Sequence, residues 1–537
     1  MLPPALIAQP GIDWVNHYGG ENGDMVWSHK AVPTGGFILA GESGSNNNGE
    51  SDMILVRVAD DGEQQWLRYY GGDDSERCFD VINTSDNGFL LVGYSRSFGE
   101  GQTDWYVIKT DSSGDPEWSR TYGGENFDEC FSAIENQEGY SLAGFTWSFG
   151  AGQKDFYLMQ IDRRGQVVWE ETYGTEDFEF CRNHVTTVDG GYALTGYSID
   201  PVDHSKDIWL VITDSEGNMD TETSFGGRFN DDAYGMIRTS DDSYLMVGYS
   251  IEEEDGDSDG FAVRTSADGD LVWEKTYGGD RDDIFQSVTE AEAGGYLLVG
   301  STYSFGEGLM DGYMVRIDQD GNEIWSTTFG GNQTDEFLSA VATQSGYSLA
   351  GESISGFESN DCWLVQSDAD PVIEFSIRLV SGWNLISAPM IPLRPEMVDV
   401  WRELVEDDNL KMVKDQRGNF YWPAMNFNNI PDWRVEQGYY VNIRQDDSLK
   451  ILNQPVEPDT PIVMDAGWSI VSYYPDSPSS AEVALRNIQN VILLAKNGAG
   501  QFYAPEFEFS NMPVLSRGNG YHLLLSRSAE LTWQIEE

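Results

Sequence analysis

Short runs of alternating polar and apolar residues follow one another along most of the chain, separated by turns rich in Gly, Asn and Asp. Within residues 127–174, four such runs occur, at 127–134, 140–145, 155–161 and 167–173. Alternation with a period of two predicts β-strands, and residues 11–371 show no helical period. This region is therefore predicted to be all-β, with four short strands in each unit.

The unit recurs seven times. Its most regular mark is a Trp position followed four residues later by an aromatic residue and Gly, as in Trp118-Ser-Arg-Thr-Tyr-Gly-Gly124. A fixed period near 50 residues is typical of propellers and solenoids, and four strands in each of seven units predict a seven-bladed β-propeller. The Trp side chains are expected to pack between blades, most weakly at Thr221. The Trp position falls at Trp14, Trp66, Trp118, Trp169, Thr221, Trp273 and Trp325.

The two ends of this region complement each other. The last unit, residues 335–367, has three predicted strands and no Trp strand, whereas residues 11–18 form a lone Trp strand. We therefore expect the N-terminal strand to complete the last blade and close the ring, which leaves no open sheet edge. Residues 1–10 are interpreted as the remainder of a leader, and residues 11–371 as the propeller.

After residue 371 the period ends and two related units follow. They share Gly382-Trp383 and Gly467-Trp468, and later Gly438-Tyr439 and Gly520-Tyr521. Each copy has one helical pattern, at 395–404 and near 480–488. The sequence predicts a duplicated, mostly β domain with one short helix per copy, with modules at 372–456 and 457–537 packed as a pseudo-twofold pair.

The net charge of −60 changes the functional picture. Residues 372–537 carry 22 acids and 13 bases, which leaves 69 acids and 18 bases in residues 1–371. Such a field repels nucleic acid and anionic membranes and favours cations or basic partners; solubility in a salty or calcium-rich habitat is the simpler explanation. We expect no nucleic-acid partner and no membrane insertion. Three of the four Cys share one repeat position, which indicates core packing and not a disulfide framework.

Two acidic positions recur in every unit. Either they fix turns by accepting hydrogen bonds from loop N–H groups, or the first set rings the mouth of the channel and attracts cations. The first set, which opens the innermost strand, is Asp24, Glu76, Asp128, Glu179, Asp231, Asp283 and Asp335; the second, which opens the third strand, is Asp52, Asp104, Asp155, Asp207, Asp259, Asp311 and Asp361.

The loop between the second and third strands is nearly identical in three units and differs in four. Loops on a rigid scaffold are where binding sites are usually built, although free drift of solvated loops gives the same pattern. The ligand-binding candidates are Asn46, Asn47, Asn48, Asp203, His204, Glu253 and Phe357. One loop, Asp255-Gly-Asp-Ser-Asp-Gly260, matches the first half of a calcium loop. Asp255, Asp257 and Asp259 are its candidate ligands, but Ser266 stands where an EF-hand needs Glu.

Catalytic motifs do not stand out. The five His are scattered without metal-ligand spacing, and no nucleophile elbow, phosphate loop or dinucleotide fingerprint occurs. No organic cofactor is expected, and calcium is the candidate ion. The 91 acids leave open an acid pair for glycoside hydrolysis.

Several motifs resemble a known family. Thr187-Val-Asp-Gly-Gly-Tyr192, Gly93-Tyr94-Ser95, the Ser-Phe-Gly-x-Gly loops and the Trp-x-x-x-Tyr-Gly-Gly turns resemble secreted bacterial and archaeal seven-bladed β-propeller repeat proteins. The Gly-Trp-Asn-Leu-Ile-Ser stretch resembles a small C-terminal module of similar secreted proteins. The resemblance implies a secreted or cell-surface, calcium-tolerant scaffold and supplies no catalytic residues.

Three functional hypotheses follow from the sequence. The first is a non-catalytic binding or adhesion scaffold that recognises an extracellular glycan or protein through the loop face. The second is a carbohydrate-active hydrolase or lyase that uses acids on that face. The third is a structural subunit of a surface layer or filament.

Overall fold

The computed structural model describes residues 12–20, 22–45, 50–200, 202, 204–251, 256–291, 294–306, 308–343, 346–354, 361–368, 373–392, 395–456, 458, 460–475, 477–507 and 509–534. The chain divides into two compact units, Met1–Asp370 and Pro371–Glu537. Each unit is described separately below.

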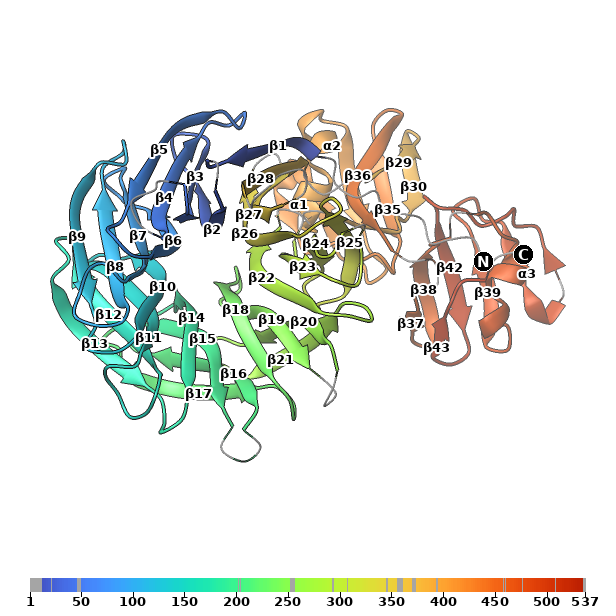
Figure 1. Ribbon diagram of the computed structural model, residues 1–537. Coiled ribbons are helices and arrows are strands. Elements are labelled where there is room, and N and C mark those ends of the chain that lie inside the picture. The colour runs from blue at the N-terminus through green and yellow to red at the C-terminus, as the bar shows by residue number, and fades with distance from the viewer. Residues whose placement is uncertain are drawn as a thin grey trace. The chain divides into compact units, whose positions relative to one another are not determined.

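The described part of the first unit consists of seven four-stranded antiparallel sheets that follow one another in chain order (Figure 1). In the first three sheets, from the innermost strand outward, the strands are β2 (Asp24–Ala31), β3 (Phe37–Ser43), β4 (Asp52–Val58) and β5 (Gln64–Tyr70); β6 (Glu76–Asn83), β7 (Phe89–Ser95), β8 (Asp104–Thr110) and β9 (Pro116–Tyr122); and β10 (Asp128–Glu135), β11 (Gly139–Thr146), β12 (Asp155–Asp162) and β13 (Val167–Tyr173).

The remaining four sheets repeat this arrangement. They are β14 (Glu179–Thr186), β15 (Tyr192–Ile199), β16 (Lys206–Thr213) and β17 (Met219–Phe225); β18 (Asp231–Arg238), β19 (Tyr244–Ile251), β20 (Ser258–Thr265) and β21 (Leu271–Tyr277); β22 (Asp283–Glu290), β23 (Tyr296–Thr302), β24 (Asp311–Ile317) and β25 (Glu323–Phe329); and β26 (Asp335–Thr343), β27 (Gly346–Ser353), β28 (Asp361–Asp368) and β1 (Ile12–Tyr18). The predicted four strands per repeat are confirmed.

Burial follows the position of a strand within its sheet. The strands β4, β7 and β8 are buried at every residue, whereas the outermost strand β9 is mostly exposed. Apolar side chains of adjacent sheets share cores; Ile38 and Met53 of the first sheet, for example, pack with Cys78 and Leu91 of the second. Burial on both faces explains why the middle strands are nearly continuous apolar runs. All four Cys are buried free thiols, as predicted.

The outermost strands hold adjacent sheets together through aromatic side chains. The Tyr70 hydroxyl donates to the Gly114 carbonyl at 2.6 Å, in the β8–β9 turn of the next sheet. Four other Tyr at this position make the same bond, namely Tyr18, Tyr122, Tyr173 and Tyr277. In β17, Thr221 and Phe225 stand in the Trp and Tyr positions. The contact of β17 with the next sheet is predicted to be the weakest because Thr221 replaces Trp. Phe225, which lacks the Tyr hydroxyl, is a second reason to expect this.

This seam bond makes Tyr277→Phe a measurable change. Tyr277 is buried and its hydroxyl lies 2.7 Å from the Gly321 carbonyl. We expect its loss to cost about 1 kcal/mol of stability, the usual net value of a neutral hydrogen bond. Urea unfolding followed by tryptophan fluorescence measures the change. An unchanged midpoint would contradict a stabilising role for this bond.

The N-terminal strand pairs where the sequence places it. β1 lies antiparallel to β28, with Val15 opposite Val365 and Tyr18 opposite Cys362. Its side chains also reach the first sheet, because the Tyr18 hydroxyl donates to Gly62 at 2.8 Å. β1 thus connects the last and first sheets of the unit.

The second unit contains two copies of one arrangement. The first copy comprises β29 (Ile373–Leu379), β30 (Gly382–Ile386), β31 (Met390–Pro392), α1 (Met397–Val400), α2 (Arg402–Glu406), β32 (Leu410–Lys414), β33 (Phe420–Trp422), η1 (Pro423–Met425), β34 (Phe427–Asn428), β35 (Tyr439–Ile443) and β36 (Asp447–Pro455). The second comprises β37 (Ile462–Met464), β38 (Gly467–Ser472), α3 (Ala481–Ala484), η2 (Arg486–Ile488), β39 (Ile492–Lys496), β40 (Phe502–Ala504), η3 (Pro505–Phe507), β41 (Phe509–Ser510), β42 (Gly520–Leu525) and β43 (Ala529–Leu531).

Both copies have a five-stranded sheet in the same order, β30-β35-β32-β33-β34 and β38-β42-β39-β40-β41. Each has its own core, with helices packed on the buried face of the sheet. The single helix predicted per copy is interrupted. The backbone leaves helical geometry at Trp401 (φ −104°, ψ 8°) and at Leu485 (φ −102°, ψ 14°). Both side chains are fully buried, so packing of a large residue overrides helix continuity.

Candidate binding site in the central cavity

The innermost strands of all seven sheets surround a cavity of about 730 Å³. Each of these strands has a β-bulge after its third residue, as between Cys78 and Asp80 in β6. A bulge adds an unpaired residue and redirects its side chain, and bulges are common beside functional sites. All seven bulged residues line the cavity: Trp27, Phe79, Phe131, Arg182, Tyr234, Gln286 and Leu338.

One side of the cavity carries an aromatic wall. Phe79 and Phe131 stack with ring centroids 4.2 Å apart and an interplanar angle of 17°. Trp27 meets Phe79 edge-on at 5.4 Å. Such offset and edge-to-face contacts are the preferred geometries of aromatic pairs, so the wall is packed in advance of any ligand.

Arg182 lies at the end of this wall. Its guanidinium stands 4.3 Å from the Phe180 ring centroid and 4.5 Å from that of Tyr234. Its Nη2 atom is 3.3 Å from Asp232 Oδ2. Burial raises the pKa of Asp232, while the charges of Arg182 and Lys206 lower it. A guanidinium held between rings and a carboxylate is preorganised, and its remaining donors can bind a ligand in fixed directions.

A second arginine, Arg77 of β6, is held in the same way between a carboxylate and an aromatic ring of the wall. Arg77 Nε lies 2.8 Å from Glu42 Oε2, and its guanidinium is 5.4 Å from the Trp27 ring. Arg77 is the second residue of β6 and Phe79 the fourth, so both side chains lie on the same side of the strand. The second residues of the innermost strands therefore add a second layer to the site.

Two carboxyl groups in this layer have perturbed pKa values. Burial raises the pKa of Glu129, and the charges of Lys154, Arg77 and Arg182 oppose that rise. Burial and the neighbouring Glu352 raise the pKa of Glu336 to about 7. Glu336 and Glu352 are directly opposite each other in the β26–β27 register. At neutral pH, Glu336 can therefore hold a proton that an ordinary Glu would lose.

The seven acids of the first predicted set are the first residues of the innermost strands and bond the turns that precede them. Each is buried, with at most 1% exposure, and accepts a backbone N–H bond from the residue four positions earlier at 2.7–2.9 Å. Asp128 also accepts from Ser148 Oγ at 2.6 Å. These contacts agree with the turn-fixing alternative, and none of these seven side chains lines the cavity. Attraction of cations by this set stays a prediction.

The second acidic set meets the first at the Gly of six of the seven aromatic-Gly turns, and at Gly19 the approaching side chain is Asp24. At Gly278, a Cβ atom would lie 2.5 Å from Asp259 Oδ1 and 2.5 Å from Asp283 Oδ2. Asp104 and Asp128 approach Gly123 in the same way. Burial raises the pKa of Asp104, and the charge of Asp128 adds to the rise. Gly recurs at this position because the two carboxylates fill the space that a Cβ atom would need.

The predicted loop ligands are only partly within the described residues. Asn46, Asn47, Asn48, Asp203, Glu253, Asp255 and Phe357 lie outside them. His204 is exposed, with a left-handed φ of 63°. Asp257 is exposed, whereas Asp259 lies against Gly278. The described residues contain no group of three or more His, Cys, Asp or Glu arranged to hold a metal, and calcium binding at this loop stays a prediction.

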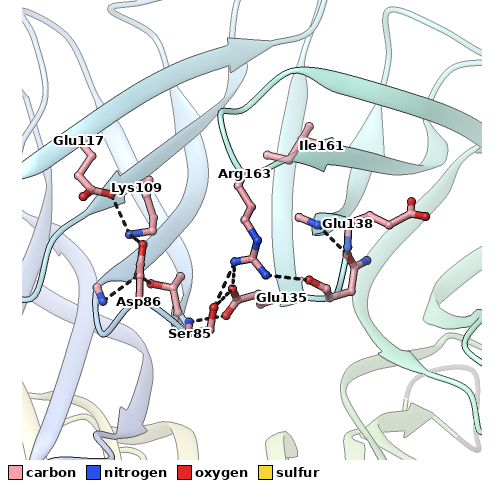
Figure 2. Close-up of polar contacts among 12 residues, drawn as sticks. Ser85, Asp86, Lys109, Glu117, Glu135, Glu138, Ile161 and Arg163 are labelled. Atoms are coloured by element: carbon pink, nitrogen blue, oxygen red, sulfur yellow. Dashed lines mark hydrogen bonds and ion pairs between the residues drawn. The ribbon is translucent and has the colours of Figure 1, made fainter.

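A separate polar network lies where β6 and β10 end, at the opposite end of these innermost strands from the acids that open them (Figure 2). Lys109 Nζ is 2.9 Å from Asp86 Oδ2 and 3.0 Å from Glu117 Oε2. Glu135 accepts from the Ser85 backbone at 2.6 Å and pairs with Arg163 (Figure 2). The network joins turns of the second and third sheets, and its charges are paired with each other, which indicates a structural role.

The cavity residues are not among the sites predicted from the sequence, although the repeats carry a signal for them. The recurring acids and glycines of the repeat hold turns, while the bulge position three residues after each acid is aromatic in four copies and Arg, Gln or Leu in the other three. Residues differ between the copies of a repeat at positions where the fold does not require one particular residue. The same comparison that singled out the variable loops would have found Trp27, Phe131 and Arg182.

Among the described residues, no helix has the length and apolar character needed to cross a membrane.

No protein-family model and no curated protein matches the chain. Solved structures that resemble it include a protein of unknown function from Dyadobacter fermentans DSM 18053, with 11% identity, a TM-score of 0.41, and coverage of 67% of this chain and 100% of that one. The WD40 domain of Neurospora crassa Pan2 has 11% identity and a TM-score of 0.37 over 66% and 98% of the two chains. PorZ, a surface component of the type-IX secretion system of Porphyromonas gingivalis, has 11% identity and a TM-score of 0.39 over 81% and 60%. Similarity at this level does not indicate a ligand or an activity.

Proposed function

We propose that the chain is a secreted or cell-surface binding scaffold that holds a glycan in the central cavity of its first unit without catalysing a reaction. The observation that carries this proposal is the set of seven bulged residues around the cavity. Equivalent positions carry Trp, Phe, Arg, Tyr, Gln and Leu side chains. A scaffold that repeats its structure and varies its cavity lining is suited to recognising one asymmetric ligand.

The proposal includes a seven-bladed β-propeller closed by β1. Its support is the pairing of β1 with β28 and the packing of β2 against β26 and β27. His29 of β2 makes a 2.9 Å bond to the Ser339 hydroxyl of β26. The pairing of β1 completes the last sheet, and the contacts of β2 join the first sheet to the last.

A glycan fits the cavity chemistry better than an apolar ligand. Sugar rings have apolar faces that pack on aromatic rings, and their hydroxyls need donors and acceptors side by side. The Phe79–Phe131 wall provides the former, and among the cavity residues Arg182 provides donors and Asp80 provides acceptors. The volume of about 730 Å³ is in the usual range for small-ligand sites.

A glycan array probed with the full chain tests this function. We expect binding to a defined set of glycans, and Trp27→Ala should weaken it at least about tenfold, because an aromatic anchor in a binding site is worth roughly 2 kcal/mol. Trp147→Ala is the matched control, since Trp147 is 36% exposed and does not line the cavity. Loss of binding in the control alone would move the site to the loops, and a protein-only partner would contradict the glycan.

A second candidate function is supported by Glu336 and Glu352. A carboxyl group whose pKa is raised to about 7 can serve as the general acid that glycoside hydrolysis needs, and Glu352 lies opposite it in the sheet register, although neither side chain is among those that line the cavity. This function predicts turnover of a bound glycan that is lost in Glu336→Gln while binding persists. Equal binding without any released product in the wild type would favour the non-catalytic scaffold.

A further inference from the structure

The two modules of the second unit meet at the ends of their strands, where isolated bridges pair Ile386 with Asn519 and Gln437 with Val471. The Gly438 N–H donates to Ile470 of the other module at 3.1 Å, and Ser387 Oγ donates to Asn519 at 2.7 Å. A Cβ on Gly438 would lie 3.3 Å from Gly520 Cα. The glycines that mark the duplication are therefore the points of closest approach, and only a residue without a side chain fits there.

Each sheet has one covered and one open face. Tyr439 and Val441 of β35 are fully buried beneath the helices, as are Tyr521 and Leu523 of β42. The residues between them, Tyr440 and His522, alternate to the open face. Helices cover the first face in both modules, and among the described residues of this unit no helix packs on the second.

The open faces meet in a line of four aromatic rings. Trp383 lies 6.4 Å from Tyr440, Tyr440 lies 5.7 Å from His522, and His522 lies 6.0 Å from Trp468, measured between ring centroids. The Tyr440 hydroxyl and His522 Nε2 are 2.6 Å apart, which joins the two halves. Burial and the charge of Lys496 lower the pKa of His522 to about 4, so this link is uncharged at neutral pH. We name these four residues the aromatic line.

A lysine accompanies each end of the aromatic line. Lys414 Nζ is 5.2 Å from the Trp383 ring centroid, and Lys496 Nζ is 5.0 Å from that of Trp468. Both Trp are 51% exposed. Neither lysine forms an ion pair with a carboxylate among the described residues. Residues 372–537 carry 22 acids and 13 bases, so two unpaired cations on one face are a local excess of positive charge.

We propose that the aromatic line and its two lysines are a binding face for an anionic polysaccharide. Trp383 and Trp468, each half-exposed and perpendicular to its inner neighbour, offer two separate apolar surfaces on which sugar rings can pack, and the ammonium groups attract carboxylate or sulfate substituents. The pseudo-twofold repeat gives two equivalent half-sites, so a chain polymer gains from occupying both. This face belongs to the second unit and is independent of the cavity in the first.

Affinity electrophoresis of the full chain through native gels tests the proposal. Gels contain polygalacturonate for carboxylate, dextran sulfate for sulfate, or dextran as the neutral polymer. We expect retention by at least one anionic polymer, decreasing as salt is added because the ion pairs are screened, and none by dextran. Trp468→Ala and Lys496→Ala should each weaken retention at least about tenfold, and Trp383→Ala/Trp468→Ala about a hundredfold.

Two further variants separate binding from folding. Lys496→Arg keeps the charge and should keep most of the retention. Arg486→Ala removes an exposed base from η2, on the covered side of the same sheet, and should change nothing. Thermal unfolding of each variant verifies the fold. Equal retention by dextran, equal retention of the Trp468→Ala variant, or no retention by either anionic polymer would overturn the proposal.

Discussion

Removing residues 1–18 is expected to abolish cooperative folding of the first unit. β1 pairs with β28 along its length, from Ile12 opposite Ser367 to Tyr18 opposite Cys362. It also packs Trp14 near Phe37 and bonds Tyr18 to Gly62 in the first sheet. At about 1 kcal/mol for each backbone bond and roughly 3 kcal/mol for a buried aromatic, the loss approaches the whole 5–15 kcal/mol stability of a domain.

Circular dichroism and urea unfolding of the truncated chain measure this loss. The matched control removes only residues 1–10 and keeps all of β1. A synthetic peptide of residues 11–20 added to the truncated chain should partly restore the unfolding midpoint, because the edge of β28 is free to pair. A truncated chain as stable as the control would contradict a closing role for β1.

The second large effect is a loss of stability in acid through two buried histidines. His29 bonds Ser339 and Ser348 of the last sheet, and His184 bonds Ser132 and Ser141. Burial lowers the pKa of each ring to about 3, from an ordinary value near 6.5. Between these values the unfolded chain takes up protons that the folded chain refuses. Stability is therefore full above pH 6.5 and falls as the pH decreases toward 3.

At pH 5.0 each histidine should cost about 2 kcal/mol relative to pH 7.5, at 1.36 kcal/mol for each pH unit below 6.5. The variants His29→Gln and His184→Gln keep a polar side chain that does not titrate. Urea midpoints at both pH values should therefore show a smaller acid loss in each variant than in the wild type. The same acid loss in wild type and variants would show that other groups cause it.

The strand order of the first unit could be predicted because its turn residues repeat. Six of the seven aromatic-Gly turns need Gly where two carboxylates meet, as at Gly278, so the period survives in the sequence. The bulges could not be predicted in the same way. Every innermost strand has one, so the repeat length is unchanged, and after the bulge the alternation shifts phase. Within a single repeat, residues such as Phe131 and Arg182 therefore look like ordinary strand positions, and only a comparison of this position among the seven copies singles them out.

The second unit shows a similar limit. The Gly438 and Gly520 spacing predicted a duplicated pair, and the two glycines do meet. The aromatic line depends on side chains from β30, β35, β38 and β42 coming together across two modules. No local pattern around Trp383 or Trp468 reports this arrangement, because exposed Trp residues in a strand occur for many reasons. The helix interruptions at Trp401 and Leu485 are likewise set by tertiary packing.

The most direct measurement is a crystal structure of the full chain with the glycan that binds it most tightly on the array. The account predicts a sugar ring against Phe79 and Phe131, with its hydroxyls hydrogen-bonded to Arg182 and Asp80, enclosed by the seven innermost strands. A glycan bound on the outer strands or the loop crown of the first unit, with only water in the cavity, would contradict it.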